Sequence, residues 1–383
     1  MTEARRTWFI NVAGARSIGG GETARRIWSE EFVRRGGSVT WYCPQSKEQI
    51  PAEGDMVPDG VQVRELRFNS SFARGILALD SVVGIARQAE AEQPDHIIIN
   101  GVSVGWLPLL AKLYAAGFSE KLVVVFHCDP KLGSPSTSRF RRLAKAVFFC
   151  ATHEIIRKMQ DHGARTIAVS NLLAEKVSKL KIGVSQVIYP PPNLNRDCHP
   201  TTRSDVSRLN VATVSRLDPE KGISFLGHLS AACRAEALPV IFRLVGTSGD
   251  KVNLKTTLSK LGNGVDYIGP RLGEGLCDQY KQADVTVAPS LNEALGLNTV
   301  ESLAHGAPVI ARNPVAREVM GEGVGVVLPA DTQAGVVMAM NYMSDLLTRK
   351  GFLPEQSQRA FAVSRSFNPQ TLAGQFVDYV AQS

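Results

Sequence analysis

Short apolar runs alternate with amphipathic segments along the first half of the chain. The apolar runs have the length of strands and contain many Val, Ile, Phe and Trp residues; they occupy residues 7–14, 38–44, 60–68, 95–100, 121–128, 146–152 and 166–171. Apolar positions at helical spacing predict helices between several of them, at 21–36, 81–92 and 104–117. This alternation is typical of a parallel sheet with helices on both faces.

A proline-rich segment separates this half from a second alternation. Residues 188–200, IYPPPNLNRDCHP, break any regular element and predict a linker. The strands expected after it lie at 209–217, 239–246, 265–269, 285–290, 307–312 and 324–329, and the helices at 222–237, 253–262, 275–283, 299–306 and 367–382. The sequence therefore predicts two doubly wound α/β domains, with a ligand cleft at the carboxyl ends of their strands.

Composition agrees with a soluble two-domain protein. The 383 residues are 44% hydrophobic and 21% charged, and this length exceeds one typical core. No apolar run reaches the length of a membrane span, and the N-terminus lacks the pattern of a secretory signal. Six cysteines lie scattered without a CxxC pair, which favours free thiols in a reducing cytoplasm. We therefore expect a cytoplasmic location.

The net charge of +7 favours an acidic partner, such as nucleic acid, anionic lipid or a phosphorylated small molecule. Nucleic acid is disfavoured because the basic residues are spread over both halves without an aromatic–basic module. The segment 138–149, SRFRRLAKAVFF, places Arg139, Arg141, Arg142 and Lys145 among apolar residues. As a helix it would suit the inner face of the cell membrane, or it would pack on the core with a solvated basic side.

A glycine cluster follows the first expected strand, in the sequence GARSIGGGETARRIW at residues 14–28. It does not fit the GxGxxG fingerprint of dinucleotide-binding domains, because the glycines gather at Gly19, Gly20 and Gly21. The segment predicts a loop that opens a helix, whose free N–H groups can hold an anion or a hydroxyl-rich ligand. The alternative is a loop that only turns the chain.

Two cations lie on the turn between a strand and a helix of the second half, VSRLDPEKGISFL at residues 214–226. Pro219 fits the first helical turn and Asp218 can cap it. Arg216 and Lys221 are then held beside a helix N-terminus, which suits a diphosphate because Arg offers a planar fork and Lys a point charge. The alternative is a pair of solvated turn charges.

The stretch NEALGLNTVE at residues 292–301 holds two glutamates across a turn. Glu293 falls on a loop at the mouth of the expected cleft, and Glu301 about one turn into a helix. Gly296 allows the backbone to approach a ligand closely, and the amides from Leu297 onward face the same point. Two such carboxylates can hold hydroxyl pairs at both ends of a nucleotide sugar, whereas solvated glutamates would explain neither the glycine nor the strand context.

These segments together resemble retaining glycosyltransferases of the GT-B fold, in glycosyltransferase family 4 (glycosyl transferases group 1). Glu293 and Glu301 match the family's E-x7-E motif, SRLDPEKG its R-L-x-x-x-K-G segment, and GGGETAR its N-terminal glycine loop. RLVGTSG, VDYIGP and ISFL agree more weakly. The matching segments span almost the whole chain in the family's order.

The resemblance implies a role for each matching residue. Glu293 would contact hydroxyls of the transferred sugar and Glu301 the ribose, while Arg216 and Lys221 would bind the diphosphate. The loop at Gly20 and Gly21, with the backbone at Gly296 and Leu297, would complete the donor site. His127, in VVVFHCDP, matches a histidine that faces the donor sugar; from the residues alone a structural role is equally open. The implied catalytic residues are His127, Arg216, Lys221 and Glu293.

The resemblance also implies the domain plan. The expected domains are an acceptor-binding domain at 1–190, a linker at 191–208 and a nucleotide-sugar-binding domain at 209–365. Residues 366–383 would form a helix that packs back on the N-terminal domain. The family's usual N-G-V-D segment is replaced here by YPPPN, and Cys128 separates His127 from Asp129.

The implied reaction is transfer of a sugar, with retention, from a UDP- or GDP-linked donor to a hydroxyl of a glycan or lipid-linked acceptor, as in polysaccharide biosynthesis. No D-x-D carboxylate pair of the metal-chelating kind is present, so we expect no metal and no cofactor. A sugar-nucleotide epimerase or hydrolase of the same fold is the alternative enzyme, and a basic nucleic-acid-binding protein the alternative without enzymatic activity.

Overall fold

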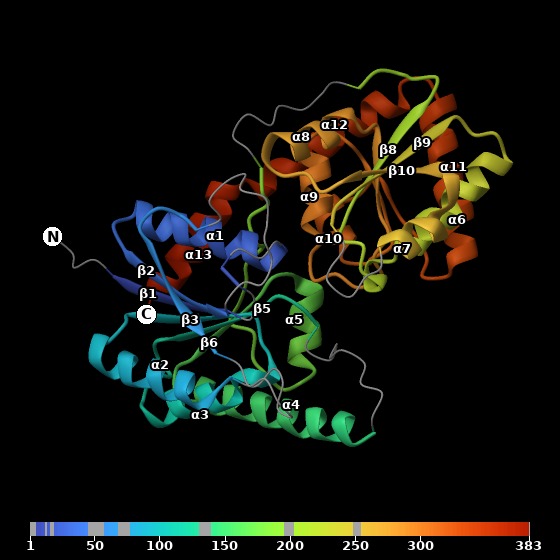
Figure 1. Ribbon diagram of the computed structural model, residues 1–383. Helices are drawn as coiled ribbons and strands as arrows, with labels where there is room; N and C mark the ends of the chain where they lie inside the picture. Colours follow the sequence, from blue (N-terminus) through green and yellow to red (C-terminus); the bar gives the residue numbers. More distant parts are fainter. Residues whose placement is uncertain are drawn as a thin grey trace. The chain divides into compact units, whose positions relative to one another are not determined.

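The computed structural model describes residues 5–11, 14–15, 19–44, 57–67, 77–129, 139–194, 203–247 and 254–382, with the backbone alone for residues 104 and 139–145. The chain divides into two compact units, which are described separately (Figure 1). Unit 1 comprises Met1–Pro191 and Pro369–Ser383, and unit 2 comprises Pro192–Asn368. None of the helices in the described part of the chain is long and apolar enough to cross a membrane.

Unit 1 contains a parallel sheet of seven strands in the order β3-β2-β1-β4-β5-β6-β7. The strands are β1 Arg6–Asn11, β2 Ser38–Pro44, β3 Val61–Leu66, β4 His96–Asn100, β5 Leu122–Phe126, β6 Arg165–Ala168 and β7 Gln186–Val187. The central strands β1, β4 and β5 are buried almost throughout, because helices cover both faces. This explains their nearly continuous apolar sequences.

The helices of unit 1 are α1 Gly20–Arg34, α2 Leu79–Glu92, the 3₁₀ turn η1 Val104–Trp106, α3 Leu107–Ala115, α4 Arg139–Gln160, α5 Asn171–Ser178 and α13 Pro369–Ala381. Figure 1 shows α2, α3 and α4 on one face of the sheet and α1 with α13 on the other. The Phe376 ring of α13 stacks on the Trp28 ring of α1, with centroids 3.8 Å apart. The terminal helix thus returns to the N-terminal unit, as predicted.

The strand expected at 146–152 is wrong. These residues lie within α4, which runs without interruption from Arg139 to Gln160. Its buried positions include Thr152, Ile156 and Met159, at the spacing of three and four residues that places side chains on one helix face. The apolar run AVFFCAT has the length of a strand, but the pattern that continues beyond it is helical.

Unit 2 contains a parallel sheet of six strands in the order β10-β9-β8-β11-β12-β13. The strands are β8 Leu209–Val214, β9 Val240–Val245, β10 Val265–Gly269, β11 Val285–Ala288, β12 Val309–Ala311 and β13 Val326–Val327. This order is that of a doubly wound nucleotide-binding domain. The predicted fold class, two Rossmann-like domains, is therefore confirmed.

The helical segments of unit 2 are η2 Pro219–Lys221, α6 Ile223–Ala235, α7 Leu254–Leu261, η3 Gly262–Gly264, α8 Gly273–Gln282, α9 Leu297–Ala304, α10 Ala316–Met320, α11 Thr332–Thr348, α12 Phe352–Ser364 and η4 Arg365–Phe367. Helices α6, α7 and α11 lie on one face of the sheet, and α9, α10 and α12 on the other (Figure 1). The apolar core contains Val211 of β8, Val285 of β11, Phe225 of α6 and Met343 of α11. It holds the two central strands, and so their loops, in place.

Candidate active site

The order of the strands in unit 2 changes direction between β8 and β11. Strands β9 and β10 follow on one side, and β12 and β13 on the other. In open parallel sheets a crevice forms at such a point, outside the carboxyl ends of the strands. The loop after β8 carries Arg216 and Lys221, and the loop after β11 carries Glu293. The sheet therefore brings these three predicted site residues to one edge.

The turn after β8 is closely packed against the neighbouring loops. Gly222 has a φ of +69°, and a β-carbon at this position would lie 2.3 Å from the carbonyl oxygen of Pro289. Gly246, after β9, has a φ of +148°, and its β-carbon would lie 1.9 Å from the carbonyl oxygen of Ser215. Glycine fits both positions because no other residue tolerates this backbone and this proximity. The backbone carrying Arg216 and Lys221 is thereby fixed from both sides.

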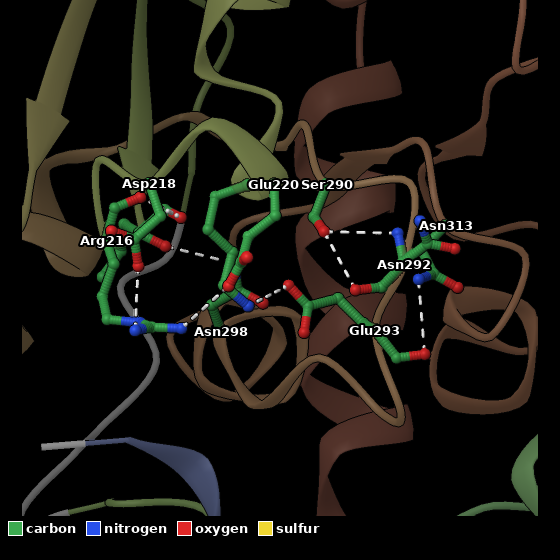
Figure 2. A network of polar contacts seen from close by, with 11 residues as sticks. Arg216, Asp218, Glu220, Ser290, Asn292, Glu293, Asn298 and Asn313 are labelled. Carbon is green, nitrogen blue, oxygen red and sulfur yellow. Dashed lines mark hydrogen bonds and ion pairs between the residues drawn. The ribbon is translucent and has the colours of Figure 1, made fainter. Parts of the chain in front are cut away.

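Lys221 and Glu293 form an ion pair across the site. The Nζ atom of Lys221 lies 2.8 Å from Oε1 of Glu293, and the two side chains are 20% and 23% exposed. Figure 2 shows Glu293 extending from its loop toward the turn that follows β8. Partial burial strengthens the attraction relative to a surface pair, because less water screens it. The structure thus joins two residues that the sequence assigned to different ends of the ligand.

Arg216 lies on the same turn but is more exposed, at 47% of its side chain. Its guanidinium contacts Asp218 at 2.8 Å and Glu220 at 3.4 Å (Figure 2). Asp218 makes no capping hydrogen bond to the following 3₁₀ turn η2, so its predicted role as a helix cap is wrong. Its carboxylate forms an ion pair with Arg216 instead.

The loop that carries Glu293 is held by side-chain amides. Asn313 donates from Nδ2 to the carbonyl oxygen of Glu293 at 3.4 Å, and its Oδ1 accepts from the N–H of Val315 at 2.9 Å. A small pocket opens beside this loop; its lining residues are Ala288, Ser290, Glu293, Leu295, Gly296, Asn298, Thr299, Ala311, Asn313, Val315 and Ala316. Apolar walls with a few converging polar groups are typical of a ligand pocket.

Gly296 and Leu297 form the start of α9 in this pocket. Gly296 has a φ of +81°, and no side chain caps the helix, whose first residue is Leu297. The Nδ2 atom of Asn298 donates to the carbonyl oxygen of Val214 at 3.1 Å, which fixes the start of the helix at the end of β8. The uncapped amides of the first turn carry partial positive charge, and they are therefore suited to an anionic group of a ligand.

Glu301 has a different environment from Glu293. Its carboxylate is buried and accepts hydrogen bonds from the Tyr280 hydroxyl at 2.9 Å and from the Asn193 N–H at 3.3 Å. Burial raises the pKa of Glu301 to about 7, although both hydrogen bonds act in the opposite direction. The carboxyl group can therefore change its charge near neutral pH.

Tyr280 is itself held by a polar network. Its ring stacks on the His305 ring with centroids 5.2 Å apart, and Nδ1 of His305 lies 2.6 Å from the carbonyl oxygen of Glu301. Nδ1 must be the donor here, because a carbonyl oxygen only accepts. Buried Arg203 donates to the carbonyl oxygens of Tyr280, Lys281 and His305. These contacts fix the position of the Glu301 carboxylate.

In unit 1 the strand order changes direction between β1 and β4, and Gly20 and Gly21 open α1 near that point. Gly20 is exposed. A β-carbon on Gly21 would lie 3.5 Å from Cγ of His127, so the glycine backbone packs against the histidine ring. The two predicted elements of this unit, the glycine segment and the histidine, are thus adjacent.

His127 follows β5 and lies within a polar and aromatic environment. Its Nε2 is 2.6 Å from Oδ1 of Asn100, and its ring centroid is 5.7 Å from that of Trp28. Burial lowers the pKa of His127 to about 4, because removal from water disfavours the charged ring. Removal from water therefore favours the neutral ring over the imidazolium at pH 7.

Two family models match the chain, one in each half. The Glycosyltransferase Family 4 model covers residues 18–196, which include Gly20, Gly21 and His127. The Glycosyl transferases group 1 model covers residues 208–345, which include Arg216, Lys221, Glu293 and Glu301. The first match ends at residue 196 and the second begins at residue 208, so the gap between them lies where the proline-rich segment ends.

The chain belongs to the group 1, family 4 glycosyltransferases.

Relatives with assigned functions carry the name D-inositol 3-phosphate glycosyltransferase. The protein from Nocardiopsis dassonvillei is 25% identical over 78% of this chain and 73% of its own length. That from Mycobacteroides abscessus is 31% identical over 37% of this chain and 32% of its own length. For three such relatives the matched segment spans only 25–32% of the relative's own length.

Solved structures of glycosyltransferases share the fold of this chain. HepE of Anabaena in complex with UDP-glucose has a TM-score of 0.73 at 20% identity, covering 99% of this chain and 100% of that one. WaaG, a glycosyltransferase involved in lipopolysaccharide biosynthesis, has a TM-score of 0.71 at 15% identity, covering 98% and 100%. At these identities the likeness shows the GT-B fold alone.

Four residues of the candidate site were not predicted from the sequence. They are Asn100, Tyr280, Asn298 and Asn313, each of which holds a predicted residue or its loop through a hydrogen bond. Asn100 ends the apolar strand IIIN, and that position was the one signal available. The others lie in unremarkable polar contexts, and their roles depend on contacts that folding creates.

Two further features of the N-terminal unit are Asp129, to which the sequence assigns no role, and the basic segment predicted to contact a membrane. Asp129, separated from His127 by Cys128, forms an ion pair with Lys176 of α5 at 3.0 Å. The side chains of Arg139, Arg141, Arg142 and Lys145 lie outside the described residues, so their predicted membrane contact stays a prediction. The backbone there is helical, as that prediction requires.

Proposed function

We propose that this protein is a retaining glycosyltransferase that moves a sugar from a nucleoside-diphosphate donor to a hydroxyl of a glycan or lipid-linked acceptor. The observation that supports this most directly is the Lys221–Glu293 pair, 2.8 Å apart beside the uncapped start of α9. A cation and a carboxylate in one partly buried site can contact two chemically different ends of a donor. Lys221 would bind the diphosphate and Glu293 the sugar hydroxyls.

The proposed step breaks the bond between the anomeric carbon and the diphosphate. The electron pair of that bond leaves with the phosphate oxygen, the acceptor oxygen bonds to the anomeric carbon from the same face, and the acceptor proton passes to the departing phosphate. Positive charge placed in advance at the leaving oxygen stabilises this transition state. Lys221, Arg216 and the amides at Leu297 would supply that charge.

Arg216 must exchange its present partners to take part. In this structure its guanidinium contacts Asp218 and Glu220, and the side chain is half exposed. Exposed ion pairs are worth about 0–1 kcal/mol, so a diphosphate can replace these partners at little cost. Glu301, held by Tyr280, would bind the ribose hydroxyls, which donate to an ionised carboxylate.

The donor is proposed to be UDP- or GDP-linked, and the comparisons favour trying UDP first. HepE of Anabaena was solved with UDP, with UDP and glucose, and with UDP-glucose. The relatives' name, D-inositol 3-phosphate glycosyltransferase, suggests a phosphorylated cyclitol as one acceptor to test. A basic chain of net charge +7 is compatible with an anionic acceptor.

The test is a thermal-shift screen of UDP-, GDP- and ADP-sugars, followed by acceptor trials with the sugar nucleotide that binds best. The expected result is stabilisation by one nucleotide family and an acceptor-dependent product whose anomeric configuration, read by NMR, equals that of the donor. Inversion at the anomeric carbon would contradict the retaining mechanism. Release of free sugar or an isomerised nucleotide sugar without acceptor would instead indicate the hydrolase or epimerase alternative.

We predict that transfer does not require a divalent metal. The positive charge on the leaving group comes from fixed side chains, chiefly Lys221, so removing metal should leave kcat/KM within about twofold. The measurement is a transfer assay with and without EDTA, using a matched amount of EDTA presaturated with Mg²⁺ as control. Activity that collapses in EDTA and returns with Mn²⁺ would contradict this prediction.

We also propose that α4 contacts an anionic membrane surface on the cytoplasmic side. Val147 and Phe148 follow the basic positions and are 60% and 37% exposed, so they are available to contact a membrane surface. Reversing the charge at Arg141, Arg142 and Lys145 should abolish flotation with anionic vesicles. The matched control reverses three exposed lysines of the same unit that lie outside α4, Lys112, Lys179 and Lys181. Equal flotation of both triple variants would exclude α4 as the contact.

A further inference from the structure

Three groups form a continuous chain of contacts at the carboxyl edge of the unit 1 sheet. Asn100 is the last residue of β4 and is buried. Its Nδ2 lies 3.3 Å from the carbonyl oxygen of Gly21, and its Oδ1 lies 2.6 Å from Nε2 of His127. One amide side chain thus connects the start of α1 with the ring that follows β5.

This chain of contacts fixes the orientation of the amide. The carbonyl oxygen of Gly21 can only accept a hydrogen bond, so the amino group of Asn100 must face it. The oxygen of Asn100 must then face His127. Because that oxygen also only accepts, Nε2 of His127 must carry a proton. The hydrogen-bond pattern therefore assigns the tautomer of the ring.

The remaining ring nitrogen is left as an acceptor. A neutral imidazole with a proton on Nε2 has a lone pair on Nδ1. Burial lowers the pKa of His127 to about 4, so this lone pair is retained at pH 7. Among the described residues, Asn100, Gly21 and Trp28 contact the ring, and none of them bonds to Nδ1. With respect to the described residues, Nδ1 is therefore available to accept a hydrogen bond from a ligand.

The charges near this ring favour a neutral ligand group over an anion. Glu22, in the first turn of α1, places its carboxylate at the helix N-terminus, where a β-carbon on Gly19 would lie 2.3 Å from Oε2. A phosphate at that N-terminus would meet this negative charge. The cation Lys176 of α5 is already paired with Asp129 at 3.0 Å. A hydroxyl, which can donate to Nδ1 and carries no charge, fits both features.

We propose that Asn100 is a positioning residue that holds His127 in its Nε2–H tautomer, so that Nδ1 accepts a hydrogen bond from a hydroxyl of the substrate. The identity of the hydroxyl as part of a donor sugar rests on the proposed function. The tautomer of His127 and the positioning role of Asn100 do not depend on the proposed function.

The test is NMR of the ring nitrogens in protein labelled with ¹⁵N-histidine, with the His127→Gln variant used to assign the signals. The free protein at pH 7 should show a protonated Nε2 and an unprotonated Nδ1. Addition of UDP-glucose should move the ¹⁵N chemical shift of Nδ1 in the direction of a hydrogen-bonded acceptor. Addition of UDP alone should leave that chemical shift unchanged. A protonated Nδ1 in the free protein would overturn the assignment to Asn100.

A variant tests the positioning role directly. Asn100→Asp replaces the amide by a carboxylate, which should raise the pKa of His127 and place protons on both ring nitrogens at pH 7. The matched control is Asn171→Asp, which adds the same charge at an exposed position of the same unit and should leave the ring unchanged. If the protonation of the His127 ring nitrogens is unchanged in a folded Asn100→Asp protein, the proposal is also overturned.

The outcomes separate this inference from the proposed function. If no nucleotide sugar binds, the proposed function fails, but the tautomer of the free protein still decides the role of Asn100. If UDP-glucose stabilises the protein while Nδ1 does not shift, the proposed function survives and contact between His127 and a substrate hydroxyl is refuted. Loss of the UDP-glucose shift in Asn100→Asp, with UDP binding retained, is the result expected.

Discussion

Replacing Lys221 by alanine is expected to lower kcat/KM for sugar transfer by about 10²–10³-fold, the usual effect of removing one group that stabilises developing negative charge. Lys221 is the partly buried cation of the site, fixed by the turn at Gly222 and bonded to Glu293 at 2.8 Å. Its loss removes charge from the leaving diphosphate and leaves the Glu293 carboxylate unpaired. The measurement is kcat/KM with the best donor, together with the melting temperature of each variant.

The matched control for this variant is Lys255→Ala, which removes an exposed lysine on α7 of the same unit and should leave kcat/KM near that of the wild type. The double variant Lys221→Ala/Glu293→Gln completes a double-mutant cycle. If the two residues act on one donor, their effects on kcat/KM should not add. A folded Lys221→Ala protein with near-normal turnover would contradict the assigned role.

Replacing Glu301 by glutamine is expected to stabilise the protein above pH 8 and to change its stability little below pH 5. Burial raises the pKa of this carboxyl from its ordinary 4.5 to about 7. The folded state therefore favours the protonated group, and that contribution is complete below about 4.5 and is lost as the pH rises through about 7. A shift of this size corresponds to an upper limit on the order of 3 kcal/mol in the free energy of unfolding.

The measurement is the melting temperature of wild type and variant between pH 5 and pH 9. Each kcal/mol corresponds to roughly 2–4 °C for a domain of this size, so the difference should reach several degrees at pH 9. Glutamine still accepts from the Tyr280 hydroxyl through its carbonyl oxygen, but its amino group would face the Asn193 N–H, which reduces the gain. A difference in melting temperature that does not depend on pH would show that burial does not raise the pKa of Glu301.

Two matched variants refine this second experiment. Tyr280→Phe removes the hydroxyl that stabilises the ionised carboxylate, so the pKa of Glu301 should rise further and the loss of stability should begin at higher pH. Glu274→Gln changes an exposed glutamate of the same unit and should alter the melting temperature little at any pH. If Glu301 binds ribose hydroxyls, Glu301→Gln should also weaken the stabilisation by nucleotide at pH 8.

Much of the fold was predictable because parallel strands and amphipathic helices have distinct apolar periods. The runs at 95–100 and 121–128 became the buried strands β4 and β5, and the segment at 222–237 became α6. The prediction was wrong at 146–152, where an apolar run of strand length belongs to a long helix. Helices α11 and α12 were not predicted. A short apolar run fits either structure, and only packing decides between them.

The sequence by itself determined the family and the places along the chain where the candidate site residues lie. Glycines before helices, Arg216 and Lys221 after a strand, and two glutamates across the Gly296 turn are local features, because the residues that create them are neighbours in the chain. The tertiary structure alone decided which side chains these residues contact. Glu293 bonds to Lys221 with 23% of its side chain exposed, while Glu301 is buried against Tyr280 and burial raises its pKa to about 7. Such differences depend on burial and on hydrogen bonds between residues far apart in sequence, as does the contact through which Asn100 assigns the tautomer of His127.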